Sequence, residues 1–428
     1  MIDIKLIREN PKRVKKLLGR RGDKEVLKKI DEIINLDGKW RKIKYNLDNL
    51  RKGRNAVSKK ISELKKAGKS ASKEMKIAKE IPEKLKEMEE EERKLEADLR
   101  CIMLTIPNFL DEKVPDGKDE SENKELFAWG EKPKFSFPIK SHAELGESLD
   151  ILDLKRAAKI TGSGFYIFKN ELAQMQRALI SFMLDFHRAK GKTEIVSPIL
   201  AKPETAEGTA HLPKFDLDMY RTREGFYLIP TAEMTLTNIH REEDLSEKEL
   251  PIRFYGYTPC FRTEAGRHGA ETPGIFRVHQ FDKVEMVTLC KPGDDDKEFN
   301  IMMADAQELL KKLEIPYRVI VLCSGDTGFK ESITYDIETW SPFMKRYMET
   351  SSISKVTDFQ ARRMNTRYQD IKENKMKLIY TLNGSALALP RLIIAILENN
   401  QNKDGSINIP KVLQPYMNGL KKIEAKKK

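Results

Sequence analysis

Cysteine and histidine are scarce in this chain of 428 residues, and long apolar runs are missing. The four cysteines include no Cys-x-x-Cys pair, so neither a disulfide framework nor a zinc knuckle is indicated. None of the six histidines forms a His-Glu-x-x-His pattern, and no zinc ligand set is evident. The N-terminal residues carry Asp3 and Glu9 and no long apolar run, so we expect neither a signal peptide nor a membrane anchor. These absences predict a protein of the reducing cytoplasm that has no membrane contact.

The excess positive charge is confined to the first quarter of the chain. Residues 1–100 contain 31 Lys and Arg against 19 Asp and Glu, whereas the remainder carries no net charge. From Lys39 to Lys66 there are eleven basic residues and two acidic ones. Such a concentration indicates a polyanionic partner, most simply a nucleic acid. A solvated coiled-coil surface, which is often rich in lysine, explains the charge equally well.

Apolar residues in the same region recur at alternating spacings of three and four. One series runs from Ile33 to Leu64 with Arg54 as its polar member, and a second runs from Ile81 to Ile102. Both series are heptad seams, and the small polar residues 67–72 between them indicate a turn. Neither helix can bury its seam alone, so we predict a long antiparallel arm whose first helix of about 32 residues spans ~48 Å. Pro82 should kink the second helix or lie near its start.

After the arm the composition changes. A stretch rich in turn-forming and acidic residues reaches about Asn123, and aromatic and β-branched runs separated by Gly and Pro follow it. Helical patterns intervene at 171–189 and 298–313. Strands mixed with helices predict an α+β domain on an antiparallel sheet. The predicted organisation is a helical arm domain over 1–110, a linker over 111–123 and an α+β domain over 124–428.

A hairpin at the centre of this domain has the side chains of a nucleotide site. Side chains alternate along a strand, so Arg277, Phe281 and Glu285 should share one face, and Arg262 and Glu264 should share a face of the preceding strand. Phe281 and Glu285 would lie about 13 Å apart, at ~3.3 Å per residue. The ring could support a purine, while the planar arginine forks match phosphate oxygens. The alternative is an ordinary amphipathic hairpin whose charges are solvated.

Five segments of the chain, in order, resemble those of a known family. The hairpin resembles motif 2 of the class II aminoacyl-tRNA synthetases, and residues 381–391 resemble motif 3. Within this class, three more segments resemble the seryl-tRNA synthetase family, namely Ile106-Pro107-Asn108, Thr231-Ala232-Glu233 and residues 358–365. The similarity runs from Met1 to Met417. It implies a coiled-coil arm joined to a class II catalytic domain, in which helices flank an antiparallel β-sheet.

The resemblance implies a two-step reaction. L-Serine and ATP form seryl-adenylate and pyrophosphate, and serine then passes to the 3′ end of tRNA(Ser). Two anions must approach one another in the first step, so the site needs positive charge and positioning rather than a protein nucleophile. The resemblance assigns the α-phosphate and the amino-acid carboxylate to Arg262, and the γ-phosphate to Arg277 and Arg391, as the expected catalytic residues. It also implies that Phe281 stacks on the adenine ring and that Glu264 accepts from the adenine amine.

The resemblance also nominates a magnesium site and a serine pocket. Mg²⁺ would bridge the phosphates of ATP through hard oxygen ligands, and the family places Glu349 and Ser352 there. Serine selection needs buried polar groups, because these reject analogues that lack the hydroxyl. By resemblance, the residues expected to bind serine are Thr231, Glu233, Arg262, Glu285, Asn383 and Ser385.

The expected macromolecular partners also follow from the resemblance. Pro198 matches the proline of motif 1, which lies at the dimer interface in this class, so we expect a homodimer. The basic arm resembles the element that grips the long variable region of tRNA(Ser), in this family from the opposite subunit. Such recognition reads shape and phosphate, so it should depend strongly on salt. Where the host has tRNA(Sec), this family charges it with serine too, which makes it a further expected substrate.

The chain departs from the family pattern at four positions. Pro273 stands in the motif 2 loop where arginine is usual, and loss of that arginine could weaken contact with the acceptor end of tRNA. Ile353 replaces a frequent cysteine after Ser352. In motif 3, Pro390 and Ala386 stand where glycine is common, and Pro390 would suit the first turn of a helix.

Two other functions fit parts of the pattern. A ligase of the same lineage that loads an amino acid onto a carrier protein would share the catalytic motifs, but such relatives lack the arm. A non-catalytic tRNA-binding paralogue would share the arm, but it would not be expected to retain Arg262, Glu264, Phe281, Glu285 and Arg391 together. ATP–pyrophosphate exchange that depends on serine is expected of an enzyme that activates serine, and of neither of these two alternatives.

Overall fold

A computed structural model of the chain describes residues 1–263 and 274–424. The chain divides into two compact units. One unit comprises residues 2–19 and 23–106 and is helical. The other comprises residue 1, residues 20–22 and the chain from Pro107 onward, and it holds every described β-strand.

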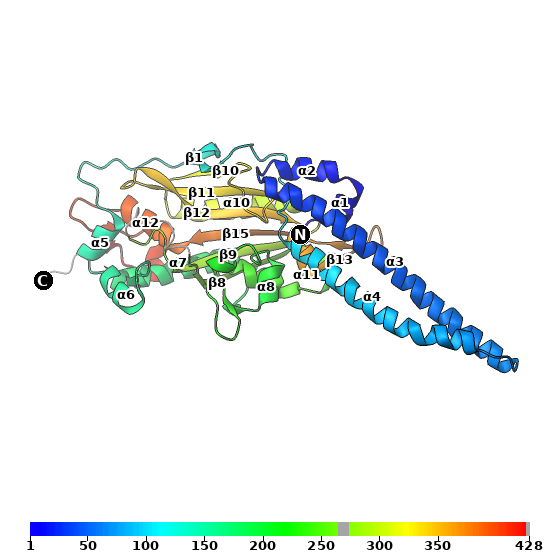
Figure 1. Cartoon of the computed structure of the whole chain (residues 1–428). Helices are drawn as coiled ribbons and strands as arrows, with labels where there is room; N and C mark the ends of the chain where they lie inside the picture. The colour runs from blue at the N-terminus through cyan, green and yellow to red at the C-terminus, as the bar shows by residue number, and fades with distance from the viewer. Residues whose placement is uncertain (264–273, 425–428) are drawn as a thin grey trace. The chain divides into compact units, whose positions relative to one another are not determined.

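The helical unit consists of two short helices and an antiparallel pair of long ones. Its helices are α1 (Ile4–Glu9), α2 (Pro11–Gly19), α3 (Lys24–Lys66) and α4 (Ser72–Leu104). Helices α3 and α4 lie side by side along their length (Figure 1). With 43 residues, α3 is longer than predicted, because the Asp23 carboxylate caps the helix by accepting from the N–H groups of Glu25 and Val26.

The predicted seam holds the two long helices together. Leu47 of α3 packs against Ile81 and Leu85 of α4, and all three side chains are buried. Arg54, the polar member of the first series, is exposed. Pro82 lies inside α4, which runs on through it, so the helix begins well before this proline. The prediction of an antiparallel two-helix arm is confirmed.

An eight-stranded sheet forms the centre of the second unit (Figure 1). Its neighbouring strands are antiparallel, except that β4 and β8 are parallel, so the predicted antiparallel sheet is confirmed. In spatial order the strands are β1 (Lys124–Trp129), β10 (Tyr317–Val321), β11 (Ile333–Ser341), β12 (Arg346–Thr357), β15 (Tyr380–Ala388), β9 (Gln280–Cys290), β8 (Ile252–Phe261) and β4 (Thr193–Glu194).

Helices pack on both faces of this sheet. Helices α7 (Asn170–Ala189), α10 (Asp295–Lys312) and α12 (Leu389–Asn399) contribute to the largest apolar core, together with Val284 and Met286 of β9. The alternate residues of β9, Val287 and Leu289, belong to a separate core with the short helices α9 (Glu233–Thr237) and α11 (Phe359–Met364). Because side chains alternate along a strand, these two cores lie on opposite faces. The helices predicted at 171–189 and 298–313 correspond to α7 and α10.

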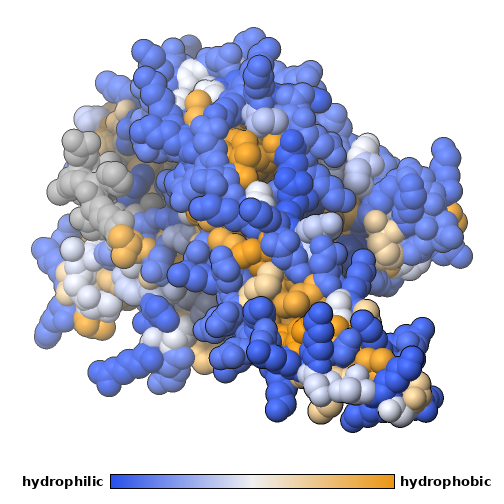
Figure 2. All heavy atoms as spheres, turned by 45° about the vertical axis from the view of Figure 1, so that its right-hand side comes forward, coloured by the Kyte–Doolittle hydropathy of each residue, from blue (hydrophilic) through white to orange (hydrophobic). Residues whose placement is uncertain are grey.

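Smaller elements complete the second unit. The surface of the chain that Figure 2 shows is mainly hydrophilic, with separate hydrophobic patches. No helix among the described residues is long and apolar enough to cross a membrane. Apart from short 3-10 helices, the remaining described elements are α5 (His142–Ser148), α6 (Leu154–Thr161), α8 (Pro203–Gly208), β2 (Leu152–Asp153), β3 (Ile167–Phe168), β5 (Leu200–Ala201), β6 (Tyr227–Leu228), β7 (Asp244–Ser246), β13 (Arg367–Asp370), β14 (Lys375–Leu378), β16 (Ile407–Asn408) and β17 (Lys422–Ile423).

Candidate functional site

Strand β9 directs three polar or aromatic side chains to the same face of the sheet. Phe281, Lys283 and Glu285 are alternate residues of this strand, on the face that also carries Val287. The neighbouring strand β8 pairs Cys260 with Phe281, and Arg262 follows directly after β8. The Arg262 guanidinium lies 5.2 Å from the centre of the Phe281 ring. An aromatic ring and a cation are thus adjacent at the end of the hairpin. The prediction that Arg262 belongs to the preceding strand is wrong, because β8 ends at Phe261.

Arg277 does not belong to this strand. Strand β9 begins at Gln280, so Arg277 lies in the preceding bends, and its side chain is exposed. The prediction that Arg277 shares a strand face with Phe281 is therefore wrong, because the strand starts later than the sequence pattern indicates. Glu264 and Pro273 lie outside the described residues.

A buried carboxylate, Glu285, lies deeper along the same face. It is 1% exposed, and one of its oxygens, Oε2, lies 2.6 Å from Lys283 Nζ and accepts from Ser385 Oγ at 3.2 Å. Lys283 Nζ also donates to Thr231 Oγ1 at 2.8 Å. Asn383 Nδ2 lies 3.5 Å from the other oxygen, Oε1. We call these five residues the Glu285 pocket.

Lys283 is a residue of this pocket that the sequence reasoning missed. Its position two residues before Glu285, on the same strand face, was the available signal. Its ammonium group compensates the buried charge of Glu285, which would otherwise be very costly to hold away from water. The pocket therefore combines a charged pair with hydroxyl and amide groups.

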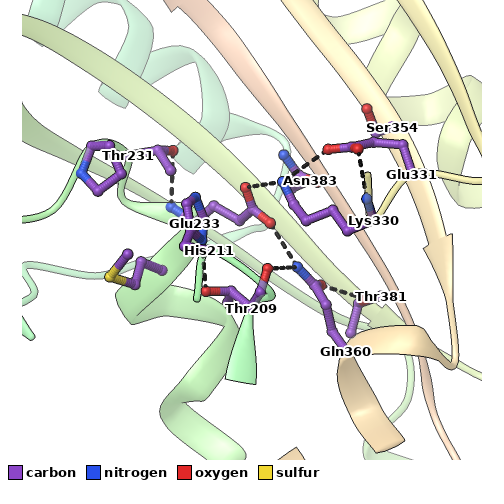
Figure 3. A network of polar contacts seen from close by, with 12 residues as sticks. Thr209, His211, Thr231, Glu233, Lys330, Glu331, Ser354, Gln360, Thr381 and Asn383 are labelled. Atoms are coloured by element: carbon purple, nitrogen blue, oxygen red, sulfur yellow. Dashed lines mark hydrogen bonds and ion pairs between the residues drawn. The ribbon is translucent and has the colours of Figure 1, made fainter. Parts of the chain in front are cut away.

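A second buried polar network surrounds Glu233 (Figure 3). Its carboxylate oxygens lie 3.0 Å from Lys330 Nζ and 2.7 Å from Gln360 Nε2. Lys330 also lies 2.9 Å from Glu331. Burial alone would lower the pKa of Lys330, but these two carboxylates outweigh it and raise that pKa above its ordinary value. Gln360 belongs to residues 358–365, one of the segments that resemble the seryl-tRNA synthetase family, whereas no sequence signal marked Lys330.

His211 lies beside this network as a neutral imidazole. Its Nδ1 is 2.9 Å from Thr209 Oγ1. Burial lowers the pKa of His211 well below its ordinary value, and the positive charges of Lys330 and Arg262 lower it further. Three residues that the sequence did not nominate, Lys330, Gln360 and His211, therefore complete the polar surroundings of Glu233.

Glu349 and Ser352 face the same side of strand β12 because of a β-bulge. Residues three apart on a regular strand point to opposite faces. Here the register with β11 shifts between Ile337 and Glu338, so Glu349 pairs with Glu338 while Ser352 pairs with Asp336. Asp336 and Glu338 are two apart and share a face, so their partners share it too. The pairing of β12 with β15 makes this the face of the Glu285 pocket.

Asp336 adds a third oxygen donor next to Glu349 and Ser352. It is 8% exposed, and its Oδ1 has no hydrogen-bond partner among the described residues. Burial and the nearby Glu349 carboxylate raise the pKa of Asp336, against the effect of a hydrogen bond with Ser352. Carboxylate and hydroxyl oxygens are the ligands that hard divalent cations prefer. This face of β11 and β12 therefore has the donor chemistry of a magnesium site.

Arg391 lies next to Glu349. It occupies the first turn of α12, where Pro390 fits without loss of a helical hydrogen bond, as predicted. Arg391 Nη1 donates to the carbonyl oxygen of Glu349 at 2.9 Å and to its Oε2 at 3.0 Å. The guanidinium carbon also lies 4.9 Å from the centre of the Phe276 ring. A cation and a carboxylate thus lie side by side at the edge of the site.

The departure at Ile353 has a physical explanation. Ser352 and Ser354 point to the site face, so Ile353 points into the apolar core on the other side, where it is fully buried. A Cβ on Gly384, the residue paired with Ile353 on β15, would lie 2.6 Å from an Ile353 side-chain carbon. Ile353 therefore affects packing beneath the site rather than the site itself, and Ala386 is buried in the same core.

Two family models match the chain. A model described as the seryl-tRNA synthetase N-terminal domain matches residues 1–110. Residues 215–400 match the tRNA synthetase class II core domain of the G, H, P, S and T enzymes. Together they cover the arm and most of the sheet that carries the site.

Curated relatives match over their full length. The chain is 45% identical to a serine–tRNA ligase of Thermodesulfovibrio yellowstonii, over 97% of this chain and 99% of the relative. It is also 45% identical to the serine–tRNA ligase of Carboxydothermus hydrogenoformans, over 100% of both chains.

Solved structures agree with these relatives. A seryl-tRNA synthetase from Pyrococcus horikoshii, complexed with ATP, superposes with a TM-score of 0.93 at 38% identity and full coverage of both chains. A cytoplasmic serine–tRNA ligase from Naegleria fowleri, in complex with AMP, gives a TM-score of 0.88 at 29% identity, over 100% of this chain and 99% of that one. The chain therefore belongs to the seryl-tRNA synthetase family of the class II aminoacyl-tRNA synthetases.

Proposed function

We propose that the chain is an ATP-dependent, AMP-forming serine–tRNA ligase. It activates L-serine to seryl-adenylate and transfers serine to the 3′ end of tRNA(Ser), with tRNA(Sec) as a further substrate where the host has it. The observation that carries the proposal is the Glu285 pocket, a buried cluster of polar side chains on the same sheet face as Phe281 and close to Arg262. Family membership over the full length of the chain supports it.

The first step brings the serine carboxylate to the α-phosphate of ATP. Phe281 supports the adenine ring, and the adjacent Arg262 neutralises both anions as they approach. Arg391 and the exposed Arg277 hold the γ-phosphate. Glu264, outside the described residues, accepts from the adenine amine. The reaction needs no protein nucleophile, because the serine carboxylate itself attacks phosphorus and pyrophosphate leaves.

The Glu285 pocket selects serine. Glu285 accepts from the serine hydroxyl, and Ser385 and Asn383 complete the polar wall around it. Thr231 and the Glu233 carboxylate hold the α-ammonium group. An analogue without the hydroxyl, such as alanine, leaves the buried Glu285 carboxylate without that donor, and the pocket rejects it for this reason.

Mg²⁺ is the cation that the reaction implies, and the residues present fit it. Glu349, Ser352 and the unpartnered Oδ1 of Asp336 are hard oxygen donors on one sheet face. An ion held there would supply positive charge against the phosphate oxygens of ATP. The residues we assign to it are Glu349 and Ser352, and Arg391 lies next to Glu349 on the phosphate side.

The arm and a dimer would supply tRNA recognition. The basic stretch from Lys39 to Lys66 would hold the phosphates of the long variable region. Pro198 lies in an exposed segment in which the Val196 side chain is 91% exposed, and burial of this segment against a second copy would account for its apolar character. The functional division is the arm domain over 1–110, the linker over 111–123 and the catalytic domain over 124–428, working in the cytoplasm.

The two other functions considered above are not favoured. A carrier-protein ligase lacks the arm, whereas residues 1–110 match the N-terminal domain of the seryl-tRNA synthetases. A non-catalytic paralogue has no reason to keep Glu285 compensated by Lys283 in a buried pocket.

The test is ATP–pyrophosphate exchange with each of the twenty amino acids, without tRNA. We expect exchange with serine, followed by charging of tRNA(Ser) when tRNA is added. Exchange with alanine or glycine in place of serine would favour the carrier-protein ligase. Absence of exchange with every amino acid, in protein that melts cooperatively, would overturn the catalytic proposal and leave a tRNA-binding protein.

A further inference from the structure

A buried histidine–glutamate pair connects helix α12 with the chain that follows residue 273. Glu398 of α12 is fully buried, and His142 at the start of α5 is 3% exposed. Glu398 Oε1 lies 3.0 Å from His142 Nδ1 and also accepts from the backbone N–H of His142 at 3.2 Å. The hydroxyl of Ser341 donates to the other oxygen, Oε2. Both oxygens of this buried carboxylate are therefore satisfied.

The second ring nitrogen of His142 holds a backbone N–H. The amide of Ile275 donates to His142 Nε2 at 3.2 Å. Nε2 must therefore carry the lone pair and Nδ1 the proton, which Nδ1 donates to Glu398. The Glu398 carboxylate therefore fixes the tautomer of His142, and this tautomer lets Nε2 accept from the backbone N–H of Ile275.

Gly274 shows how closely the backbone passes the imidazole ring. A Cβ at this position would lie 2.0 Å from His142 Nε2. Its φ of +101° is also a conformation that residues with a side chain rarely adopt. Two independent constraints therefore require glycine where the chain meets His142.

Phe276, two residues further on, contacts Arg391. The Phe276 carbonyl accepts from Arg391 Nε at 3.4 Å, and its ring lies 4.9 Å from the Arg391 guanidinium and 5.4 Å from that of Arg346. Arg391 and Glu398 both belong to α12 and are separated by about two helical turns. The segment from Gly274 to Arg277 is thus attached to one helix at two points, through His142 at Glu398 and through Phe276 at Arg391.

We propose that His142, oriented by Glu398, is a positioning residue for the ATP site. It holds the segment 274–277 so that Phe276 lies against Arg391 and keeps its guanidinium directed to the phosphates. His142 itself does not touch substrate, because it is buried beneath the segment. The inference rests on the proposed assignment of Arg391 to the γ-phosphate of ATP. It predicts an effect on ATP that serine does not share, since no residue of the Glu285 pocket has a described contact with Phe276.

Two substitutions of His142 separate its two contacts. The amide of His142→Asn occupies the place of Nδ1 and keeps the bond to Glu398, but it loses the acceptor for Ile275. The longer His142→Gln places its carbonyl near Nε2 and keeps that acceptor. We expect the Asn variant to raise the KM for ATP in exchange about tenfold, because a small displacement of a phosphate ligand is costly. The Gln variant should restore most of the ATP affinity, and the KM for serine should stay within about twofold in both.

Ser341→Ala is the matched control. It removes a hydrogen bond to the same buried carboxylate without touching the contact with Ile275. We expect it to lower the melting temperature and leave the KM for ATP unchanged. Direct ATP binding without serine, measured by calorimetry, gives a readout that does not need turnover.

The outcomes distinguish this inference from the proposed function. Lack of serine-dependent exchange by the unmodified protein would overturn the proposed function. Normal exchange by that protein, with an ATP affinity of His142→Asn equal to that of the unmodified protein, would overturn the positioning role alone. The role would also be overturned if the KM for ATP and the KM for serine rose in parallel, or if Ser341→Ala weakened ATP binding as much as His142→Asn does.

Discussion

Glu349 and Ser352 lie three residues apart on strand β12 and still face the same side of the sheet. The shift in register with β11 between Ile337 and Glu338 makes this possible, because regular alternation would turn one of the two into the opposite core. The bulge also places Asp336 opposite Ser352. Three oxygen-bearing side chains therefore converge on the face that carries the Glu285 pocket, where a nucleotide and its cation would lie.

We expect Asp336→Asn to weaken cation binding without destabilising the fold. The Asp336 carboxyl is buried near Glu349 and leaves Oδ1 unpartnered among the described residues, so its replacement by an amide of the same shape removes little native stabilisation. Titration of Mn²⁺ by electron paramagnetic resonance, with ATP and no serine, should show affinity about tenfold lower, as when a metal ligand or its supporting residue is removed. A melting temperature several degrees lower with unchanged Mn²⁺ affinity would mean that Asp336 is structural.

Lys283→Met should destabilise the protein strongly. The substitution leaves the Glu285 carboxylate buried without its cation, which costs about 3–5 kcal/mol in the free energy of unfolding. Urea unfolding measures this free energy. Lys291→Met is the control, since Lys291 pairs with Glu247 near the surface and its loss should cost about 1 kcal/mol or less. Equal losses in the two variants would contradict the account of the Glu285 pocket.

Arg391→Ala should abolish adenylate formation and leave tRNA binding intact. The substitution removes the cation that contacts Glu349 and Phe276 at the phosphate side of the site, and a reduction of exchange by about 100-fold or more is expected. Exchange assays and filter binding of tRNA measure the two properties separately. Arg367→Ala, which breaks a surface pair with Asp244, should leave both unchanged. An unaltered exchange rate in Arg391→Ala would mean that this arginine is wrongly assigned.

The affinity for tRNA should fall steeply with salt, and the arm should determine the slope. Lys52 and Lys59 are exposed on α3 within the basic stretch. Replacing both by glutamine should reduce the slope of log affinity against log salt by roughly one for each phosphate that the arm no longer neutralises. Filter binding over a salt series measures this slope, with Lys372→Gln on the second unit as the control. Serine-dependent exchange without tRNA should be unaffected, and an unchanged slope would count against the arm as the tRNA-binding surface.

Stability should decline as the pH falls below about 6.5, partly through His187. Burial, reinforced by Lys192, lowers the pKa of His187 to about 2, so the folded state keeps it neutral. The unfolded chain binds a proton near its ordinary pKa of ~6.5, so acid favours unfolding. At pH 5.5 this residue should lower the free energy of unfolding by about 1.4 kcal/mol relative to its value at high pH. His187→Asn keeps an acceptor for Lys192. Its free energy of unfolding, measured in urea, should decline less between pH 7.5 and 5.5 than that of the unmodified protein. An identical decline in the two proteins would exclude His187 as a source of the pH dependence.

Local patterns in the sequence were enough to predict the two long helices of the arm and the alternation of side chains along β9. Heptad spacing is a property of one helix at a time, so the seam with Leu47, Ile81 and Leu85 could be predicted without knowledge of the rest of the chain. The alternation of β9 likewise placed Phe281 and Glu285 on one face. Arg277 shows the limit of this reasoning, because alternation does not reveal where a strand begins.

Contacts between distant segments were decided only by the tertiary structure. The register of β11 with β12 brings Asp336 to Ser352, and the packing of α5 against α12 brings His142 to Glu398. Lys330 meets Glu233 across about a hundred residues of chain. No local periodicity encodes such pairings, because they depend on how separate strands and helices align in the folded sheet. The sequence by itself therefore determined the elements and the residue types of the site, whereas the fold decided which charges compensate one another and which segments hold them in place.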